Sequence, residues 1–566
     1  MGNFIGNCKY RCSVGISDTK IEVDEWIDIN KSKPKCDVFE VNCYDKNTKK
    51  LLFQDLFLQL VKINNFKKEE PTFLIDSYPL NELNDKYSIH IILLDSISQY
   101  NIERGFVKTL NYLKKTYKAF NFKYLNKIAT NSQPNAYGFL MNRRVIPLLN
   151  MKNSNVTPSD YEKIGKSYCN EYLDNEPYII KYYRQLNYKI LIGEDGDESV
   201  FAWQRCKGFN TSYSHHTTRP YMYHLKNKKK SIYIENFHKK CLKRHSLHLD
   251  YLSSFLKTYK NSKTFSLTWL SSISHSHITG HYQYDKYFQK YFKKNKQFFD
   301  NSFLFIMSDH GFKMGNYRFT DIGDYEDRNP FLIISVPNDL RDENNEIIKN
   351  MKYNINKHIS HYDIYATLLD IATEAGRNNF KILKQFDLNK IIKNDKIKGL
   401  SLLRKIEKSR ECFDMEISGE HCLCREKFYT FDQTFLQKKY NINEEDSQEI
   451  FNIIIKRIKN NFLNSLNFMI NRGNVSNICM PLMLKNNGLF IIKYKELQNG
   501  KLFFWIRQEV LPKGIFEAYF YENGEIAMLS HLRIDPYKKY TQPCIGPGDY
   551  EKYCYCKSLL EKRQEK

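Results

Sequence analysis

Five uninterrupted apolar runs of strand length constrain the fold of this chain more than any other feature. The runs are Ser88–Asp95, Tyr188–Asp195, Thr264–Ser272, Ser302–Asp309 and Pro330–Pro337. Continuous apolar runs, unlike alternating ones, are typical of strands that are buried on both faces. Segments with helical spacing lie between them, including one from Ile102 to Phe120 and one from Asp250 to Tyr259. This alternation predicts an α/β fold with a doubly wound, mostly parallel sheet.

The length of 566 residues is too great for one ordinary domain and suggests two or three. We expect residues 1–81 to be a cysteine-containing, mostly irregular N-terminal segment and residues 82–425 to form the α/β core. Residues 426–566 are expected to form a smaller α+β module, because a helical repeat at 447–471 precedes three strand-like segments. These segments lie at 489–497, 501–510 and 516–529.

The net charge of +23 comes from basic residues that are spread along the chain, so we do not expect a nucleic-acid partner. The fourteen cysteines gather near both ends without zinc-finger spacing, which favours disulfide bonds in an extracellular or secretory-lumen protein. The alternative is a reduced cytosolic protein with buried thiols. Acceptor sequences for N-glycosylation begin at Asn30, Asn155, Asn210 and Asn474, although an Asn-rich chain produces such sequences by chance.

No apolar segment is long enough for a membrane span, and none near the N-terminus has the length of a signal-peptide core. Either the N-terminus of the sequence is incomplete, or the expected localisation is wrong. The sequence does not indicate an oligomeric state.

Polar residues follow the apolar runs at the points where a parallel sheet would gather them. The first run ends in Asp95, the third leads into His275 and His277, and the fourth ends in Asp309 and His310. Ligands of open parallel sheets bind beyond the carboxyl ends of the strands. Carboxylates and imidazoles are ligands of zinc and manganese, so these residues predict a site for a divalent metal. The glycine that follows His310 would permit a turn or a close approach of the backbone.

Several ordered motifs of this chain are similar to those of one family. They are "ILLDSIS" from Ile92, "KIATNSQPNA" from Lys127, "ISHSH" from Ile273 and "MSDHGFKMGNYRFTDIGDYEDRNPF" from Met307. Over about residues 85 to 425 the chain resembles the family of domain of unknown function 229, within the alkaline phosphatase and sulfatase superfamily. The resemblance implies an alkaline-phosphatase-like core and a metal-dependent hydrolase or group transferase that acts on small or glycan-borne phosphate or sulfate esters.

The resemblance also implies roles for individual residues. Asp95, Asp309 and His310 would hold one divalent cation, and Ser132, which stands where the family usually has Thr, would be the nucleophile. Metal coordination would lower the pKa of its hydroxyl group. His275 would bind a second cation or position the substrate. Its usual Asp neighbour is replaced by Ser276, which puts the second metal in doubt, and His277 is the candidate to compensate.

Two further residues, Arg318 and Glu326, match family positions near the pocket. Together with His277 they are the candidate substrate-binding residues. The guanidinium group of Arg318 can hold two oxygens of a phosphate or sulfate. The alternative is a structural ion pair. His361 precedes a segment that resembles a packing helix, and we expect it to be structural. The alternative for the whole chain is a catalytically inactive extracellular binding protein that retains the fold.

Overall fold

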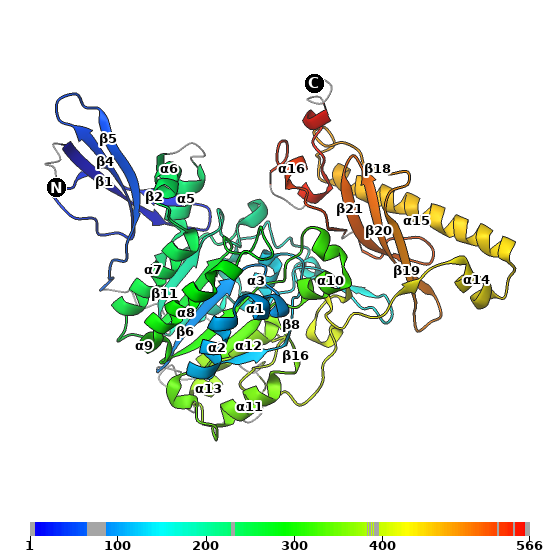
Figure 1. The fold of residues 1–566 in the computed structure, drawn as a ribbon, viewed down its shortest axis with the longest axis horizontal. Coiled ribbons are helices and arrows are strands. Elements are labelled where there is room, and N and C mark those ends of the chain that lie inside the picture. Colours follow the sequence, from blue (N-terminus) through cyan, green and yellow to red (C-terminus); the bar gives the residue numbers. More distant parts are fainter. Residues whose placement is uncertain are drawn as a thin grey trace. The chain divides into compact units, whose positions relative to one another are not determined.

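The five apolar runs form strands of a single seven-stranded sheet in the computed structural model (Figure 1). In spatial order the strands are β12 (His216–Thr217), β11 (Lys189–Glu194), β13 (Thr264–Leu270), β6 (Ser88–Leu94), β14 (Ser302–Met307), β15 (Leu332–Ser335) and β7 (Phe120–Phe122). The first five run parallel to one another. Strand β15 is antiparallel to β14, and β7 is antiparallel to β15. The sheet is therefore mostly parallel, with β6 at its centre between β13 and β14.

The structure describes residues 6–64, 86–227, 232–377, 379–381, 383, 387, 389, 396–528, 531–546 and 550–560. The expected boundary between residues 81 and 82 lies outside these ranges.

Helices pack on both faces of the sheet. On one face, Ile92 and Leu94 of β6 join a core with residues of α1 (Gln99–Gly105), α2 (Val107–Thr116), α7 (Arg244–Thr258) and α8 (Asp285–Lys294). On the other face, the ring of Phe265 lies 4.8 Å from that of Tyr183 in α4 (Ile179–Gln185). Trp269 of β13 lies 5.9 Å from Phe139 in α3 (Ser132–Met141). Since both faces are covered, the strands have no solvated side, which explains their continuous apolar sequences.

The remaining elements of this region are short strands and helices. They are β8 (Tyr124–Asn126), β16 (His358–Ser360), α5 (Arg219–Asn227), α6 (Ile232–Lys239), α9 (Lys296–Phe299), α10 (Asp321–Arg328), α11 (Glu346–Asn354), α12 (His361–Ala372) and α13 (Glu374–Arg377). Strands β8 and β16 pair in parallel in a two-stranded sheet of their own.

The single helix expected from Ile102 to Phe120 is wrong. Two helices, α1 and α2, are separated at Phe106, whose φ of −111° and ψ of 43° are not helical. Phe120 begins β7 instead. The apolar residues keep a helical spacing across this break, because both helices bury side chains in the same core. Periodicity alone therefore does not reveal the interruption.

The N-terminal residues are not irregular, contrary to expectation. They form a five-stranded antiparallel sheet from β1 (Gly6–Gly15), β2 (Ile21–Val23), β3 (Ile27–Asp28), β4 (Val38–Asp45) and β5 (Leu51–Leu58). Cys8 pairs directly across from Cys43 on β1 and β4, and the two form a disulfide bond. A second disulfide joins Cys12 to Cys36. Because this sheet has a small apolar core, covalent links supply part of the stability that a larger core would give.

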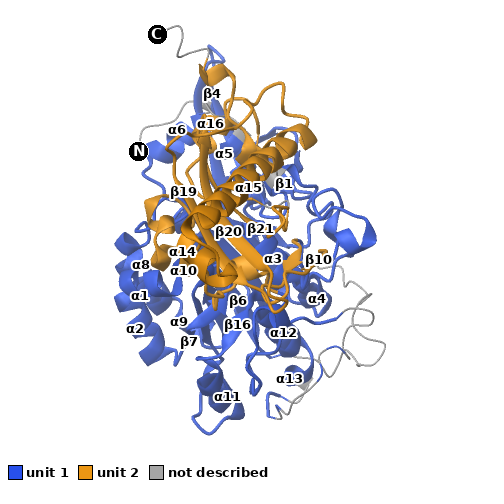
Figure 2. Ribbon diagram, turned by 90° about the vertical axis from the view of Figure 1, so that its right-hand side faces the viewer, with its two compact units in different colours: residues 1–145, 160–312, 326–416 blue, residues 146–159, 313–325, 417–566 orange. Residues whose placement is uncertain are grey.

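The chain divides into two compact units that do not follow sequence order (Figure 2). The first unit consists of residues 1–145, 160–312 and 326–416. The second unit consists of residues 146–159, 313–325 and 417–566. Thus the C-terminal module, expected from residue 426, is joined in its unit by two segments from the middle of the sequence.

The second unit is built on a six-stranded sheet and one long helix, α15 (Glu444–Arg472). Its other elements are β9 (Leu148–Leu149), β10 (Val156–Thr157), β17 (Tyr429–Thr430), α14 (Gln433–Tyr440), β18 (Met483–Leu484), β19 (Phe490–Glu496), β20 (Leu502–Leu511), β21 (Gly514–Tyr521), β22 (Leu532–Arg533) and α16 (Lys538–Thr541). Ile458 and Phe462 of α15 share a core with Phe504 and Ile506 of β20. The helical repeat and the three strand-like segments of the sequence correspond to α15, β19, β20 and β21.

Candidate metal centre

The carboxyl ends of the central strands β6 and β14 bring Asp95, Asp309 and His310 together. The strands are parallel neighbours in which Leu93 pairs with Met307, so the residues that follow each strand meet at one edge of the sheet. One ligand atom from each of the three side chains lies within 4.8 Å of the others, and all three residues are buried. The sequence-predicted pair and the distant aspartate therefore form one cluster.

Asp95 is oriented by three hydrogen bonds. The Ser96 hydroxyl donates to its Oδ1 at 2.8 Å, and the Ser271 hydroxyl and the Trp269 indole donate to its Oδ2 at 2.9 and 3.2 Å. Burial by itself would raise the pKa of Asp95, but the nearby His275 and His310 and the hydrogen bonds outweigh it and hold the pKa below its usual value. Asp95 is thus kept ionised at the centre of the cluster.

Asp309 has one satisfied and one unsatisfied oxygen. Its Oδ1 accepts the backbone N–H of Ser96 at 3.1 Å. Its Oδ2 is buried, has no hydrogen-bond partner and lies 3.3 Å from Nε2 of His310. Burial, together with the charge of Asp95, raises the pKa of Asp309 to about 7. A buried carboxylate oxygen without a donor is costly unless a cation or a proton fills the position.

The ring of His310 is fixed by its other nitrogen. Nδ1 lies 2.7 Å from the carbonyl oxygen of Gly311, which can only accept a hydrogen bond, so Nδ1 carries the proton. Nε2 then carries the lone pair of the ring and lies within the cluster, as is usual for histidine ligands of metals. Gly311 is needed here, because a Cβ atom at this position would lie 1.9 Å from the carbonyl oxygen of Glu326. This close approach of the backbone confirms the role that we expected for the glycine.

Ser132 lies beside the cluster at the first position of α3. Its Oγ is 3.4 Å from both Oδ2 of Asp95 and Nε2 of His310. The loop before it is held by Asn135, whose Oδ1 accepts the N–H groups of Ile128 and Ala129 at 2.9 and 3.0 Å. A position at a helix N-terminus also favours negative charge that develops near the hydroxyl.

These residues fit a divalent metal ion. Two carboxylates and one imidazole are ligands that zinc and manganese accept, and the hydroxyl of Ser132 is close enough to complete the set. The unpartnered Oδ2 of Asp309 is the observation on which this fit rests. In the part of the chain that the structure describes, no second group combines three or more carboxylate and imidazole ligands in this way.

The two other histidines predicted for the site differ in their surroundings. His275 is partly buried and lies close enough to Asp95 to lower the pKa of that carboxyl, and its N–H donates to the carbonyl oxygen of Ser271 at 3.2 Å. His277 is exposed. His275 therefore lies near the cluster, whereas the side chain of His277 faces solvent.

Two of the predicted substrate-binding residues, Glu326 and Arg318, take part in ion pairs. Glu326 is buried and accepts from Arg104 at 2.8 and 2.9 Å and from the hydroxyl of Ser98 at 2.6 Å. Arg318, in the second compact unit, is 2.5 Å from Asp324 of the same unit. His361 begins α12, is buried, and has its Nδ1 3.3 Å from the carbonyl oxygen of Asn126.

The sequence motifs assigned no role to four residues that shape the cluster, namely Ser96, Asn135, Trp269 and Ser271. Trp269 and Ser271 are accessible to the argument that identified Asp95, because they occupy the end of the adjacent strand. Asn135 lies within the motif around Ser132, but nothing in the sequence showed that its amide would organise the loop.

One family model matches most of the chain. The model of the family described as "Protein of unknown function (DUF229)" matches residues 6–488. No curated protein matches the chain.

Solved structures to which the chain is similar include the C-terminal periplasmic domain of EcEptC from Escherichia coli, with 12% identity and a TM-score of 0.34, covering 61% of this chain and 92% of that one. They also include the lipoteichoic acid synthase LtaP from Listeria monocytogenes, with 12% identity and a TM-score of 0.35, covering 59% and 79%. A third is a protein in the alkaline phosphatase superfamily from Vibrio parahaemolyticus, with 14% identity and a TM-score of 0.33, covering 54% and 71%. Because these TM-scores are below 0.5, the similarities carry no argument about function.

Proposed function

We propose that this chain, which belongs to the DUF229 family, is a metal-dependent hydrolase or group transferase of phosphate or sulfate esters that uses Ser132 as its nucleophile. The observation that carries the proposal is the position of the Ser132 hydroxyl, 3.4 Å from ligand atoms of both Asp95 and His310. Its support is therefore a candidate nucleophile and three candidate metal ligands gathered from three separate parts of the sequence.

The metal ligands in this proposal are Asp95, Asp309 and His310. A bound zinc or manganese ion would lower the pKa of the adjacent hydroxyl and offset the negative charge of the ester. Asp309 would supply its Oδ2, and His310 its unprotonated Nε2.

Ser132 would form the new covalent bond. Its Oγ bonds to the phosphorus or sulfur atom as the bond from that atom to the leaving oxygen breaks, and the proton of the hydroxyl passes through solvent to that oxygen, which leaves as the alcohol. Water or a second alcohol then takes the group from Ser132, which restores the hydroxyl. The N-terminus of α3 favours the negative charge on the transferred group. Glu326 holds Arg104 in an ion pair within the first unit.

The test is hydrolysis of aryl phosphate and aryl sulfate by the purified protein with added zinc or manganese. We expect Ser132→Ala to abolish turnover and to retain the metal, because the three other ligands remain. Ser254→Ala is the matched control, since Ser254 is exposed on α7. Equal turnover by wild-type protein and Ser132→Ala would refute the serine nucleophile.

A second candidate is a catalytically inactive binding protein with the same fold. The observation in its favour is that Ser276 replaces the aspartate of the family motif, with His277 exposed beside it. Metal analysis separates the two functions. A protein that purifies without a divalent ion, and whose ligand binding is indifferent to chelator, would be the binding protein.

We propose an extracellular or secretory-lumen setting for either function. The described residues contain disulfides Cys8–Cys43, Cys12–Cys36, Cys169–Cys206, Cys479–Cys554 and Cys544–Cys556. Such bonds persist in oxidising compartments. The acceptor residues Asn30, Asn155, Asn210 and Asn474 are all exposed, as glycosylation would require. None of the described helices combines the length and the apolarity that a bilayer crossing requires.

A further inference from the structure

Asp195, which follows β11, holds the turn at Ser271 and Ser272 with one buried carboxylate. Its Oδ1 accepts the N–H of Ser271 at 2.5 Å and that of Ser272 at 3.2 Å. Its Oδ2 accepts the N–H of Ser272 at 3.2 Å and the hydroxyl of Ser272 at 2.5 Å. Asp195 is only 1% exposed, so these charge-assisted bonds form away from water and are stronger than bonds at a surface.

The turn that Asp195 holds leads directly to the metal centre. The hydroxyl of Ser271 donates to Oδ2 of Asp95 at 2.9 Å, and the N–H of His275 donates to the carbonyl oxygen of Ser271 at 3.2 Å. One residue of the turn therefore orients a metal ligand through its side chain and fixes the backbone of a nearby histidine through its carbonyl group.

Backbone pairing places Asp195 and Asp95 on either side of this turn. The N–H of Asp195 donates to the carbonyl oxygen of Trp269 at 3.1 Å, and the N–H of Asp95 donates to that of Leu270 at 3.2 Å. The end of β13 thus lies between the two aspartates. A shift of the turn would move Ser271 relative to Asp95, while the strands themselves stayed in place.

A buried carboxylate needs a neighbouring positive charge or strong donors. Burial raises the pKa of Asp195, and the nearby His248 together with the donors of Ser271 and Ser272 opposes that rise. Nδ1 and Nε2 of His248 lie 2.8 and 3.0 Å from the carbonyl oxygens of Arg244 and Glu194, so the ring is held in place at the end of β11. Asp195 itself has no ligand atom in the metal cluster.

We propose that Asp195 is a positioning residue of the metal centre, which holds the Ser271–Ser272 turn so that Ser271 aligns Asp95 for the cation. The proposal rests on the proposed function, because it assigns Asp195 to the same site. Neighbours that orient a metal ligand typically contribute about 10–100-fold to metal affinity or activity.

The test compares Asp195→Asn with Asp197→Asn by zinc titration of the folded protein. Asp197 is a matched control on the same loop, since it is exposed and pairs with Arg244 at 2.8 Å. We expect zinc affinity to fall about 10–100-fold in Asp195→Asn. It should change less than about twofold in the control, whose surface pair contributes little. Unchanged affinity in Asp195→Asn would overturn the proposal.

A double-mutant cycle with Ser271→Ala separates positioning from general destabilisation. If Asp195 acts through Ser271, the loss in the double variant should be clearly smaller than the product of the two single losses. Independent, multiplicative losses would contradict the proposal. Should Asp195→Asn not fold, Ser272→Ala removes only the hydroxyl bond to Asp195, and we expect it to weaken zinc binding in the same direction. Unchanged affinity in that variant would count against the proposal.

Hydrogen exchange of the peptide that contains residues 271–275 provides a readout without metal or substrate. The N–H groups of Ser271 and Ser272 should exchange faster in Asp195→Asn than in the wild type and the control. Equal exchange would refute the role of Asp195. If wild-type protein binds no zinc and hydrolyses no ester, the proposed function fails, while faster exchange in the variant would still support the role of Asp195 in holding the turn.

Discussion

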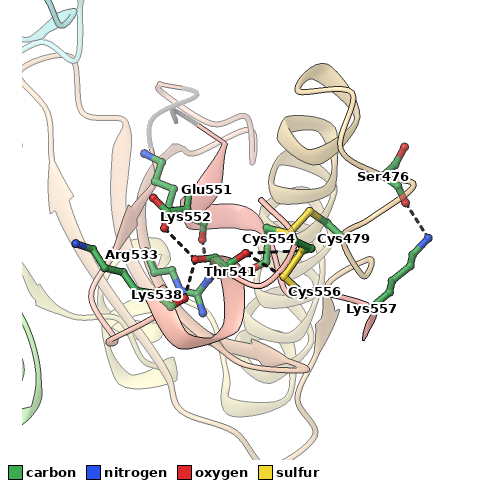
Figure 3. The surroundings of a disulfide bond; sticks show 11 residues. Ser476, Cys479, Arg533, Lys538, Thr541, Glu551, Lys552, Cys554, Cys556 and Lys557 are labelled. Carbon is green, nitrogen blue, oxygen red and sulfur yellow. Dashed lines mark hydrogen bonds between the residues drawn. A yellow bond between two sulfur atoms is a disulfide. The ribbon is translucent and has the colours of Figure 1, made fainter. Parts of the chain in front are cut away.

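Each of the two compact units contains a cluster of three potential metal ligands. The two clusters differ in whether their ligand atoms are available to a metal ion. In the first unit, Asp309 leaves one buried oxygen without a partner. In the second unit, Cys479, Cys544 and Cys554 also lie within 4.8 Å of one another. Their sulfurs are already joined in the disulfides Cys479–Cys554 and Cys544–Cys556 (Figure 3).

The comparison shows that proximity of ligand residues does not by itself make a metal site. Cysteine binds a metal ion as the thiolate, and a cysteine in a disulfide bond has no thiolate. The cysteine cluster therefore cannot bind a metal ion while its disulfide bonds are intact, and we call it the closed cluster. We call the cluster of two carboxylates and one imidazole the open cluster, because its neighbours orient the side chains and leave one carboxylate oxygen without a hydrogen bond.

The largest expected effect comes from removing the open ligand. Asp309→Asn should lose stoichiometric zinc and reduce hydrolysis by more than roughly 100-fold, the upper range for residues that only support a ligand. Metal analysis of the purified variant and its turnover on an aryl ester measure both quantities. Asp250→Asn, an exposed change on α7, is the control and should behave like the wild type. One zinc ion per chain in Asp309→Asn would contradict the assignment.

Opening the closed cluster should change stability and leave metal content unchanged. Replacing both Cys479 and Cys554 by serine removes a bond between residues 75 positions apart. The free energy of unfolding of the second unit should fall by about 2–4 kcal/mol. Urea unfolding measures this loss. A lower zinc content in the double variant would mean that these sulfurs, and not the carboxylates, bind the ion.

The pH dependence of zinc binding should also distinguish the two clusters, because the sulfurs of a disulfide bond do not titrate. Burial and the charge of Asp95 raise the pKa of Asp309 from 3.8 to about 7. Zinc competes with this proton, so affinity should fall by up to about tenfold per pH unit below pH 7 and level off above it. Zinc titration from pH 5 to pH 8 tests this, and a flat profile would refute it.

The raised pKa of Asp309 also makes the stability of the metal-free protein depend on pH, in the direction opposite to that of zinc affinity. Because the folded state binds the proton of Asp309 more tightly than the unfolded state, its contribution to stability is fully present below about pH 4 and is lost as pH rises through about 7. Thermal unfolding of chelator-treated protein should show this trend. Asp309→Asn should show a weaker dependence over the same range.

The sequence predicted the central strands because continuous apolar runs have few alternatives in a domain of this size. It did not predict that β15 would be antiparallel, because the apolar pattern is the same for either direction. It also missed β7 and β12, which are only three and two residues long. The N-terminal sheet escaped notice because disulfides replace part of its apolar core, so its strands lack strong hydrophobic patterning.

The residues of the site also divide into those that the sequence could predict and those that it could not. Asp95, Asp309 and His310 could be proposed because each follows a strong strand signal, and the topology then brings them together. Ser132 was identified from a motif that resembles the family, with no strand signal of its own. The partners that fix their orientation, such as Ser271 and Asn135, depend on side-chain directions in turns, and residue spacing does not encode these.

The smallest expected effects concern the two histidines near the open cluster. His277 is exposed, so His277→Ala should leave zinc stoichiometry at one ion and change affinity by less than about twofold, as for most surface substitutions. His275 lies close enough to lower the pKa of Asp95, and His275→Ala should therefore raise that pKa, so that zinc affinity begins to fall at a higher pH than in the wild type. Zinc titrations of both variants over a falling pH series measure the difference, which should vanish at pH 8. A second zinc ion in the wild type that disappears in His277→Ala would show instead that His277 compensates for the aspartate that Ser276 replaces, and the site would hold two ions.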